Sequence, residues 1–145
     1  MQTVLVNGEK ITPSKVVCVG RNYVAHIEEL GNEVPEEMVV FNKPNSAISD
    51  ILRSQMDGEA LHYEGELAFA VSHGELSAVG FGLDLTKRSL QSVLKEKGLP
   101  WERAKAFDGA ALFSDFVPLP ANIHTPVSYT HLRAHETVLV IAYAV

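Results

Sequence analysis

The chain of 145 residues carries 12 Lys and Arg against 18 Asp and Glu, a formal net charge of −6, and 46% of its residues are hydrophobic. This composition is typical of a globular protein with one modest core, and a negative chain without a basic cluster is a poor partner for nucleic acid or an anionic membrane. We therefore expect a small molecule or a cation as the ligand. The start shows no secretory signal, and no apolar run approaches the ~20 residues that span a bilayer, so we expect a cytoplasmic protein with no membrane partner.

Short strands and one short helix are predicted in the first third of the chain. "TVLVNGEKI" (3–11) places two apolar runs around an Asn-Gly pair, which favours a hairpin turn. "KVVCVG" (15–20) is a strand whose single cysteine, Cys18, we expect to be a buried core thiol. "RNYVAHIEELGN" (21–32) has apolar residues at helical spacing, and "EMVVFNKP" (37–44) is a further strand.

Two longer strands and one clear helix are predicted next. "ALHYEGELAFAVS" (60–72) and "SAVGFGLDLT" (77–86) read as strands whose glycines mark bulges or close backbone approach. "TKRSLQSVLKEKG" (86–98) reads as a helix with Leu90, Val93 and Leu94 on one face and Gly98 as its stop. We therefore expect an α+β fold that is mainly β.

Acidic residues gather where the two long strands meet polar sequence. Glu64 and Glu66 project from one face of a strand, together with His62 if the strand extends that far, and the apolar run after them indicates a partly desolvated position. Carboxylates held together there need a proton or a cation between them. Asp84 supplies a third, and three hard oxygen ligands suit Mg²⁺ or Mn²⁺. The alternatives are a solvated glutamate pair and, for Asp84, a helix cap.

A second group consists of His26 with Glu29 and several cations. Spaced three apart on the predicted short helix, the two side chains can touch, and a carboxylate beside an imidazole makes a general base. Pairs of this kind are also common on exposed helices. Arg21, Lys43 and Lys105 can each hold a carboxylate or stabilise an enolate, or be solvated surface charges.

Five motifs in order resemble the fumarylacetoacetate hydrolase superfamily, most closely its bacterial acylpyruvase and oxaloacetate-decarboxylase-like branch. They are "KVVCVGRNYVAHIEEL", "PEEMVVFNKPNSAI", "LHYEGEL", "GFGLDLTKRSLQ" and "KGLPWERAKAFDGAALFSDFVP". The resemblance runs from about Lys15 to about Pro120, and five ordered motifs are far more specific than any one of them.

The resemblance implies a mixed β-roll and a divalent ion, Mg²⁺ or Mn²⁺, held by Glu64, Glu66 and Asp84. It implies catalytic roles for the His26–Glu29 dyad on a lid and for Lys105, and pocket positions for Arg21 and Gln91. The implied reaction is metal-dependent cleavage of a C–C bond in a small 2-oxo acid through a metal-stabilised enolate, by acylpyruvate hydrolysis or oxaloacetate decarboxylation. Relatives also isomerise or tautomerise, and they commonly form homodimers.

The end of the chain departs from the family. Members continue through further strands and a Gly-Thr-Pro motif that this sequence lacks, so we expect a β-roll incomplete at its C-terminus. "VSYTHLRAHET" resembles the conceptual translation of a sequencing adapter, and we interpret 1–126 as a partial catalytic domain and 127–145 as a non-native tail. A real edge strand is the competing interpretation of this tail. A truncated, inactive fragment and a metal-binding module without catalysis are the competing hypotheses of function.

Overall fold

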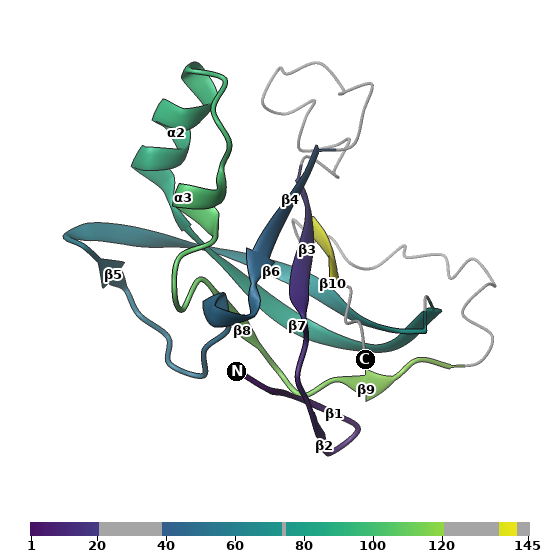
Figure 1. Ribbon diagram of the computed structural model, residues 1–145. Coiled ribbons are helices and arrows are strands. Elements are labelled where there is room, and N and C mark those ends of the chain that lie inside the picture. The colour runs from purple at the N-terminus through teal and green to yellow at the C-terminus, as the bar shows by residue number, and fades with distance from the viewer. Residues whose placement is uncertain (21–38, 74, 121–136, 142–145) are drawn as a thin grey trace, which may run out of the picture.

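The computed structural model describes residues 1–20, 39–73, 75–120 and 137–141, and strands dominate it (Figure 1). The strands are β1 (Val4–Val6), β2 (Glu9–Ile11), β3 (Lys15–Gly20), β4 (Val39–Pro44), β5 (Gln55–Met56), β6 (Glu59–Ser72), β7 (Glu75–Lys87), β8 (Ala111–Phe113), β9 (Val117–Pro118) and β10 (Thr137–Ile141). The helical elements are η1 (Asn45–Ala47), α2 (Arg88–Glu96) and α3 (Glu102–Lys105). The expected α+β, mainly β class is confirmed.

The largest sheet is built on the long antiparallel pair of β6 and β7. Its strand order is β10-β6-β7-β8, with β5 added to β6 and β9 added to β7. Alternation along β6 follows the hydrophobic pattern of the sequence, since Ala68 and Ala70 are buried. The ladder places Glu64 opposite Asp84 and Glu66 opposite Gly82, and its register shifts between Ala70 and Val71.

A second, two-stranded sheet of β3 and β4 crosses in front of β6 and β7 (Figure 1). Its inward residues, Val16, Cys18 and Phe41, join Ala68 and Ala70 in the hydrophobic core. The β6–β7 face of this core is lined by small residues, which leaves room for aromatic rings. A Cβ placed on Gly80 would lie 3.1 Å from the ring of Phe116. Gly80 therefore marks a close approach to the strand, as predicted for the glycines of this segment.

The Asn-Gly hairpin predicted at the start of the chain is confirmed. β1 and β2 pair antiparallel, and Asn7 (φ 50°) and Gly8 (φ 81°) supply the two positive φ angles that such a turn needs. Phe116 N donates to Leu5 O at 2.9 Å, and Asn7 N donates to Phe116 O at 2.9 Å, so the hairpin is tied to the segment after β8.

The predicted helix forms as α2. Of the residues predicted on one face, Leu94 is 2% exposed and packs inside, whereas Val93 is 44% exposed and lies at the edge of that face. Glu59, at the start of β6, caps the helix, because its Oε1 accepts hydrogen bonds from Ser89 N at 2.9 Å and Leu90 N at 3.4 Å. Figure 1 shows α2 and α3 together at the end of the sheet where β6 begins.

Other predictions fall partly outside the described residues. The helix expected over 21–32 lies outside them, and the strand expected over 37–44 is described only from Val39. β10 pairs parallel with β6 and falls in the segment 127–145, whose assignment as a non-native tail stays a prediction. In the described part of the chain, no helix is long and apolar enough to cross a bilayer.

Candidate active site

The acidic residues singled out in the sequence meet on one face of the β6–β7 pair. Residues directly opposite in an antiparallel ladder share a face, so Glu64 and Asp84 lie side by side, and Glu66 lies two residues farther along β6 on the same side. Glu66 is 2% exposed and Asp84 is 3% exposed. The solvated alternative for the glutamate pair is therefore wrong for Glu66. Asp84 is also not the cap of α2, which is supplied by Glu59.

The ammonium of Lys105 lies between two of these carboxylates. Lys105 is the last residue of α3 and is 2% exposed. Its Nζ donates at 2.7 Å to Glu64 Oε2, at 2.7 Å to Asp84 Oδ2 and at 2.7 Å to Thr86 Oγ1. An ammonium has three hydrogens, and all three are used. The surface-charge interpretation of Lys105 is therefore wrong.

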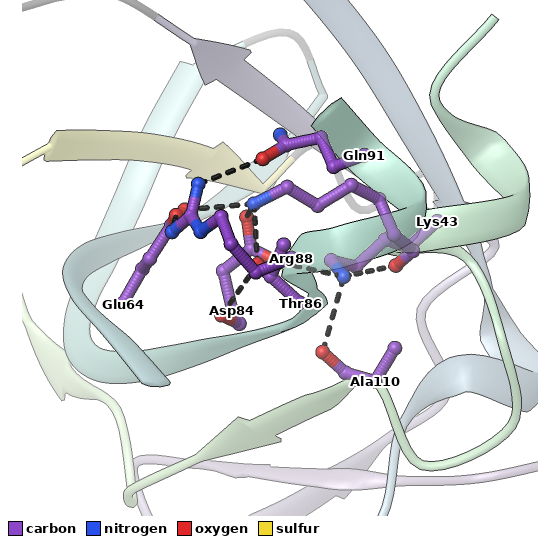
Figure 2. A network of polar contacts seen from close by, with 8 residues as sticks. Lys43, Glu64, Asp84, Thr86, Arg88, Gln91 and Ala110 are labelled. Atoms are coloured by element: carbon purple, nitrogen blue, oxygen red, sulfur yellow. Dashed lines mark hydrogen bonds and ion pairs between the residues drawn. The ribbon is translucent and has the colours of Figure 1, made fainter. Parts of the chain in front are cut away.

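A second lysine, Lys43, approaches Asp84 from the other side (Figure 2). Its Nζ lies 2.8 Å from Asp84 Oδ1 and donates to Ala110 O at 3.1 Å and to Lys105 O. Lys43 shares the inward face of β4 with Phe41 and is 1% exposed, so it is not a surface charge either. Asp84 thus has one cation on each carboxylate oxygen.

Arg88 closes the more exposed end of the cluster (Figure 2). Its guanidinium pairs with Glu64 Oε1 and donates to Gln91 Oε1 at 2.7 Å. The side chain of Arg88 is 38% exposed and that of Glu64 is 30% exposed, in contrast to the buried Lys43–Asp84 end. Gln91 contacts Arg88 in the cluster, and its predicted place in a substrate pocket stays a prediction. Arg88 was not predicted from the sequence, although its i, i+3 spacing to Gln91 is a usable signal.

Charge in the cluster is set by these contacts. Burial alone would raise the pKa of Glu64, but the ammonium of Lys105 and the guanidinium of Arg88 outweigh burial and hold that pKa below its ordinary value. Burial also raises the pKa of the Cys18 thiol, and the nearby Asp84 carboxylate adds to the effect. Cys18 is therefore a neutral core thiol beside the cluster, as the sequence predicted.

The donors fit a hard divalent cation in their chemistry. As the side chains lie, the described residues group no three His, Cys, Asp or Glu side chains as a metal site. Glu64 Oε2 and Asp84 Oδ2 nevertheless both contact the Lys105 ammonium, so these two carboxylates already lie close enough to share one cation. Glu66 faces the same side, and carboxylate oxygens are the ligands that Mg²⁺ and Mn²⁺ prefer. Glu64, Glu66 and Asp84 stay the predicted ligands.

The remaining predicted site residues are not brought into this cluster by the described structure. Arg21, His26 and Glu29 lie outside the described residues. His62, which was expected to join the glutamates if the strand extended that far, lies within β6, but its side chain is exposed.

Comparisons with known proteins point in one direction. Residues 15–138 match the family model described as fumarylacetoacetate (FAA) hydrolase C-terminal. The chain is 44% identical over 119 residues to oxaloacetate tautomerase YcgM of Escherichia coli, covering 72% of this chain and 54% of that protein. It is 34% identical over 122 residues to the mitochondrial oxaloacetate decarboxylase of Dictyostelium discoideum, covering 74% and 56%.

A solved structure is similar over most of the chain. Fumarylpyruvate hydrolase from Pseudomonas aeruginosa, crystallised with Mn²⁺ and pyruvate, matches with a TM-score of 0.71 and 30% identity, covering 81% of this chain and 59% of that one. The chain therefore spans little more than half the length of the relatives that it matches.

Proposed function

Because the chain belongs to the fumarylacetoacetate hydrolase family, we propose that its acidic cluster forms and stabilises the enolate of a small 2-oxo acid. The observation that carries this proposal is the Lys105 ammonium held between Glu64 and Asp84. A buried cation with carboxylate partners is suited to stabilise an oxygen that becomes negative when an enolate forms.

The side chains divide the work between binding and charge stabilisation. Arg88, at the more exposed end, offers a guanidinium whose planar fork matches the carboxylate of the substrate. Gln91 orients that guanidinium through its side-chain oxygen. Lys105 donates a hydrogen bond to the developing enolate oxygen once substrate displaces one of its present acceptors.

We propose that Glu64, Glu66 and Asp84 hold Mg²⁺ or Mn²⁺. Such an ion, when bound, stabilises negative charge on the substrate oxygens as a Lewis acid. The Mn²⁺ in the Pseudomonas fumarylpyruvate hydrolase supports divalent-metal use in the family. The assignments of His26 and Glu29 as the proton-transfer dyad and of Arg21 as a pocket residue are carried by the resemblance alone.

Two kinds of reaction need a stabilised enolate, and relatives have names of both kinds. Tautomerisation uses the enolate of the intact substrate, and cleavage uses the enolate of the smaller 2-oxo acid that is released. In tautomerisation the proton that left carbon is exchanged for one on oxygen, and no C–C bond breaks. In the cleavage reactions the enolate forms by loss of CO₂ or after water attacks the distal carbonyl, with the dyad activating that water. We place oxaloacetate tautomerisation beside cleavage because the relative with 44% identity is named a tautomerase.

The experiment measures both outcomes on one substrate. The purified chain is given oxaloacetate with Mn²⁺, the enol is followed by its ultraviolet absorbance, and pyruvate is followed by coupling to lactate dehydrogenase. Asp84→Asn should abolish conversion and weaken Mn²⁺ binding at least about tenfold by calorimetry, because a charged ligand is lost. Asp57→Asn is the matched control, since Asp57 is an exposed acid paired with Lys87. Full activity in EDTA, or unchanged Mn²⁺ binding by Asp84→Asn, would reject the metal proposal.

The state of this chain is a separate proposal. The fragment hypothesis expects an aggregating or inactive polypeptide, and the catalytic hypothesis expects a folded one that turns over substrate. Size exclusion and a thermal melt decide between them, since a cooperative melt of a soluble species contradicts the fragment hypothesis. Size exclusion of the full-length parent would test the expected homodimer, and the cytoplasmic location stays a prediction.

A further inference from the structure

Lys43 is held by oxygens of the protein. Its Nζ donates hydrogen bonds to Ala110 O at 3.1 Å and to the carbonyl of Lys105, and it forms an ion pair with Asp84 Oδ1 at 2.8 Å. The side chain is 1% exposed. Because the ammonium is buried among these oxygens, Lys43 is not placed to bind substrate.

The three oxygens around Lys43 Nζ belong to different parts of the cluster. Asp84 lies on β7, and its second oxygen binds the Lys105 ammonium at 2.7 Å. The Lys105 carbonyl lies at the end of α3, a helix of four residues whose last carbonyls have few partners of their own. Ala110 O also accepts from Leu85 N at 2.9 Å, which ties the start of β8 to β7.

We propose that Lys43 is a positioning residue that holds the Asp84 carboxylate and the backbone of Lys105 in one arrangement. The inference rests on the proposed function, because the arrangement positions the Lys105 ammonium that donates to the enolate oxygen and the Asp84 carboxylate proposed to hold the metal ion. Lys43 fixes the buried oxygen of Asp84, which leaves the Lys105 ammonium able to exchange Asp84 or Glu64 for substrate while its backbone stays in place. One lysine therefore acts on structure, and the other acts on substrate.

The first test is Lys43→Met, which keeps an unbranched apolar side chain as far as Cε and removes the ammonium with its charge and hydrogen bonds. We expect kcat to fall at least about tenfold with KM within about twofold, because substrate binding does not use Lys43. Lys87→Met is the matched control, since Lys87 pairs with the exposed Asp57 outside the cluster, and its kcat should stay unchanged. A KM raised about tenfold with kcat unchanged would overturn the proposal by placing Lys43 on the substrate.

A second readout does not depend on turnover. The ammonium hydrogens of Lys105 are protected by three side-chain acceptors, so nitrogen-15 spectra of labelled lysine should show slow exchange with water. Lys43→Met should accelerate that exchange at least about tenfold, and Lys87→Met should not. Unchanged exchange in Lys43→Met would overturn the proposal. If the wild-type chain binds Mn²⁺ but converts no 2-oxo acid, the proposed function fails. The exchange rate of the Lys105 ammonium hydrogens then still tests whether Lys43 positions Lys105.

A third comparison measures folding stability in place of turnover. Asp84→Asn removes the charge that Lys43 faces, so Lys43→Met should shift the denaturation midpoint less in the Asp84→Asn background than in the wild type. An equal shift in both backgrounds would show that Lys43 does not act through Asp84, and would overturn the proposal.

Discussion

Replacing Lys105 with methionine tests how strongly the two carboxylates depend on the ammonium between them. Removing one member of a buried ion pair costs roughly 3–5 kcal/mol, because the remaining charge loses its compensation. Here each carboxylate keeps a second cation: Asp84 keeps Lys43 at 2.8 Å, and Glu64 keeps Arg88. We therefore expect Lys105→Met to lower the free energy of unfolding by about 3 kcal/mol, at the low end of that range.

The assay is urea denaturation of the metal-free chain at neutral pH, followed by circular dichroism. Lys87→Met is the control, because the pair of Lys87 with Asp57 lies outside the cluster and has one partner in solvent: the Asp57 side chain is 78% exposed and the Lys87 side chain is 12% exposed. An ion pair with a solvent-exposed partner contributes about 1 kcal/mol or less. The slope of the transition should be the same in all three proteins, so that midpoints compare stability. If Lys105→Met costs no more than Lys87→Met, the cluster does not depend on its central cation, and the electrostatic reasoning behind the site is refuted.

Three further predictions concern the parts of the structure around the cluster. Burial opposes ionisation of Glu64, but its cations hold the pKa below the ordinary 4.5, so the ionised side chain stabilises the fold above pH 4.5 and this contribution fades as the pH falls through the lowered pKa. The loss of stability in Glu64→Gln should therefore shrink on acidification, and an equal loss at neutral and strongly acidic pH in urea titrations would contradict it. Glu59→Ala removes the cap of α2 and should cost about 1 kcal/mol in the same assay, with Glu59→Gln retaining more of the helix signal. Gly80→Ala places a Cβ 3.1 Å from the ring of Phe116 and should cost roughly 1–3 kcal/mol by overpacking, whereas a neutral change would show that the ring moves freely.

Local patterns predicted much of the fold because they depend on neighbours in sequence. The Asn7–Gly8 turn needs only two residues with positive φ, and the structure supplies both. The alternation of β6 predicted that Glu64 and Glu66 share a face, and this requires nothing beyond the period of a strand.

Long-range features could not be predicted in the same way. That Asp84 lies opposite Glu64 depends on the register of β6 and β7, which the turn and the bulge after Ala70 set together. α3 has four residues, too few for a helical period to be visible. The burial of Lys43 follows from the sheet that β4 packs against, although its i, i+2 spacing to the apolar Phe41 was a usable signal.

β6 carries a glutamate at two positions that are two residues apart, Glu64 and Glu66. A refolding chain that docks β6 one pleat out of place keeps every side chain on its native face and still sets a carboxylate, Glu66, against Asp84. The alternation of hydrophobic and polar residues does not distinguish this shifted register from the native one, because a two-residue shift leaves every side chain on the same face. Two local features do not repeat at a two-residue shift: the irregularity after Ala70, and Gly65, where an added Cβ would lie 3.0 Å from the ring of Phe81. We therefore expect these two places to help fix the native register of β6 and β7.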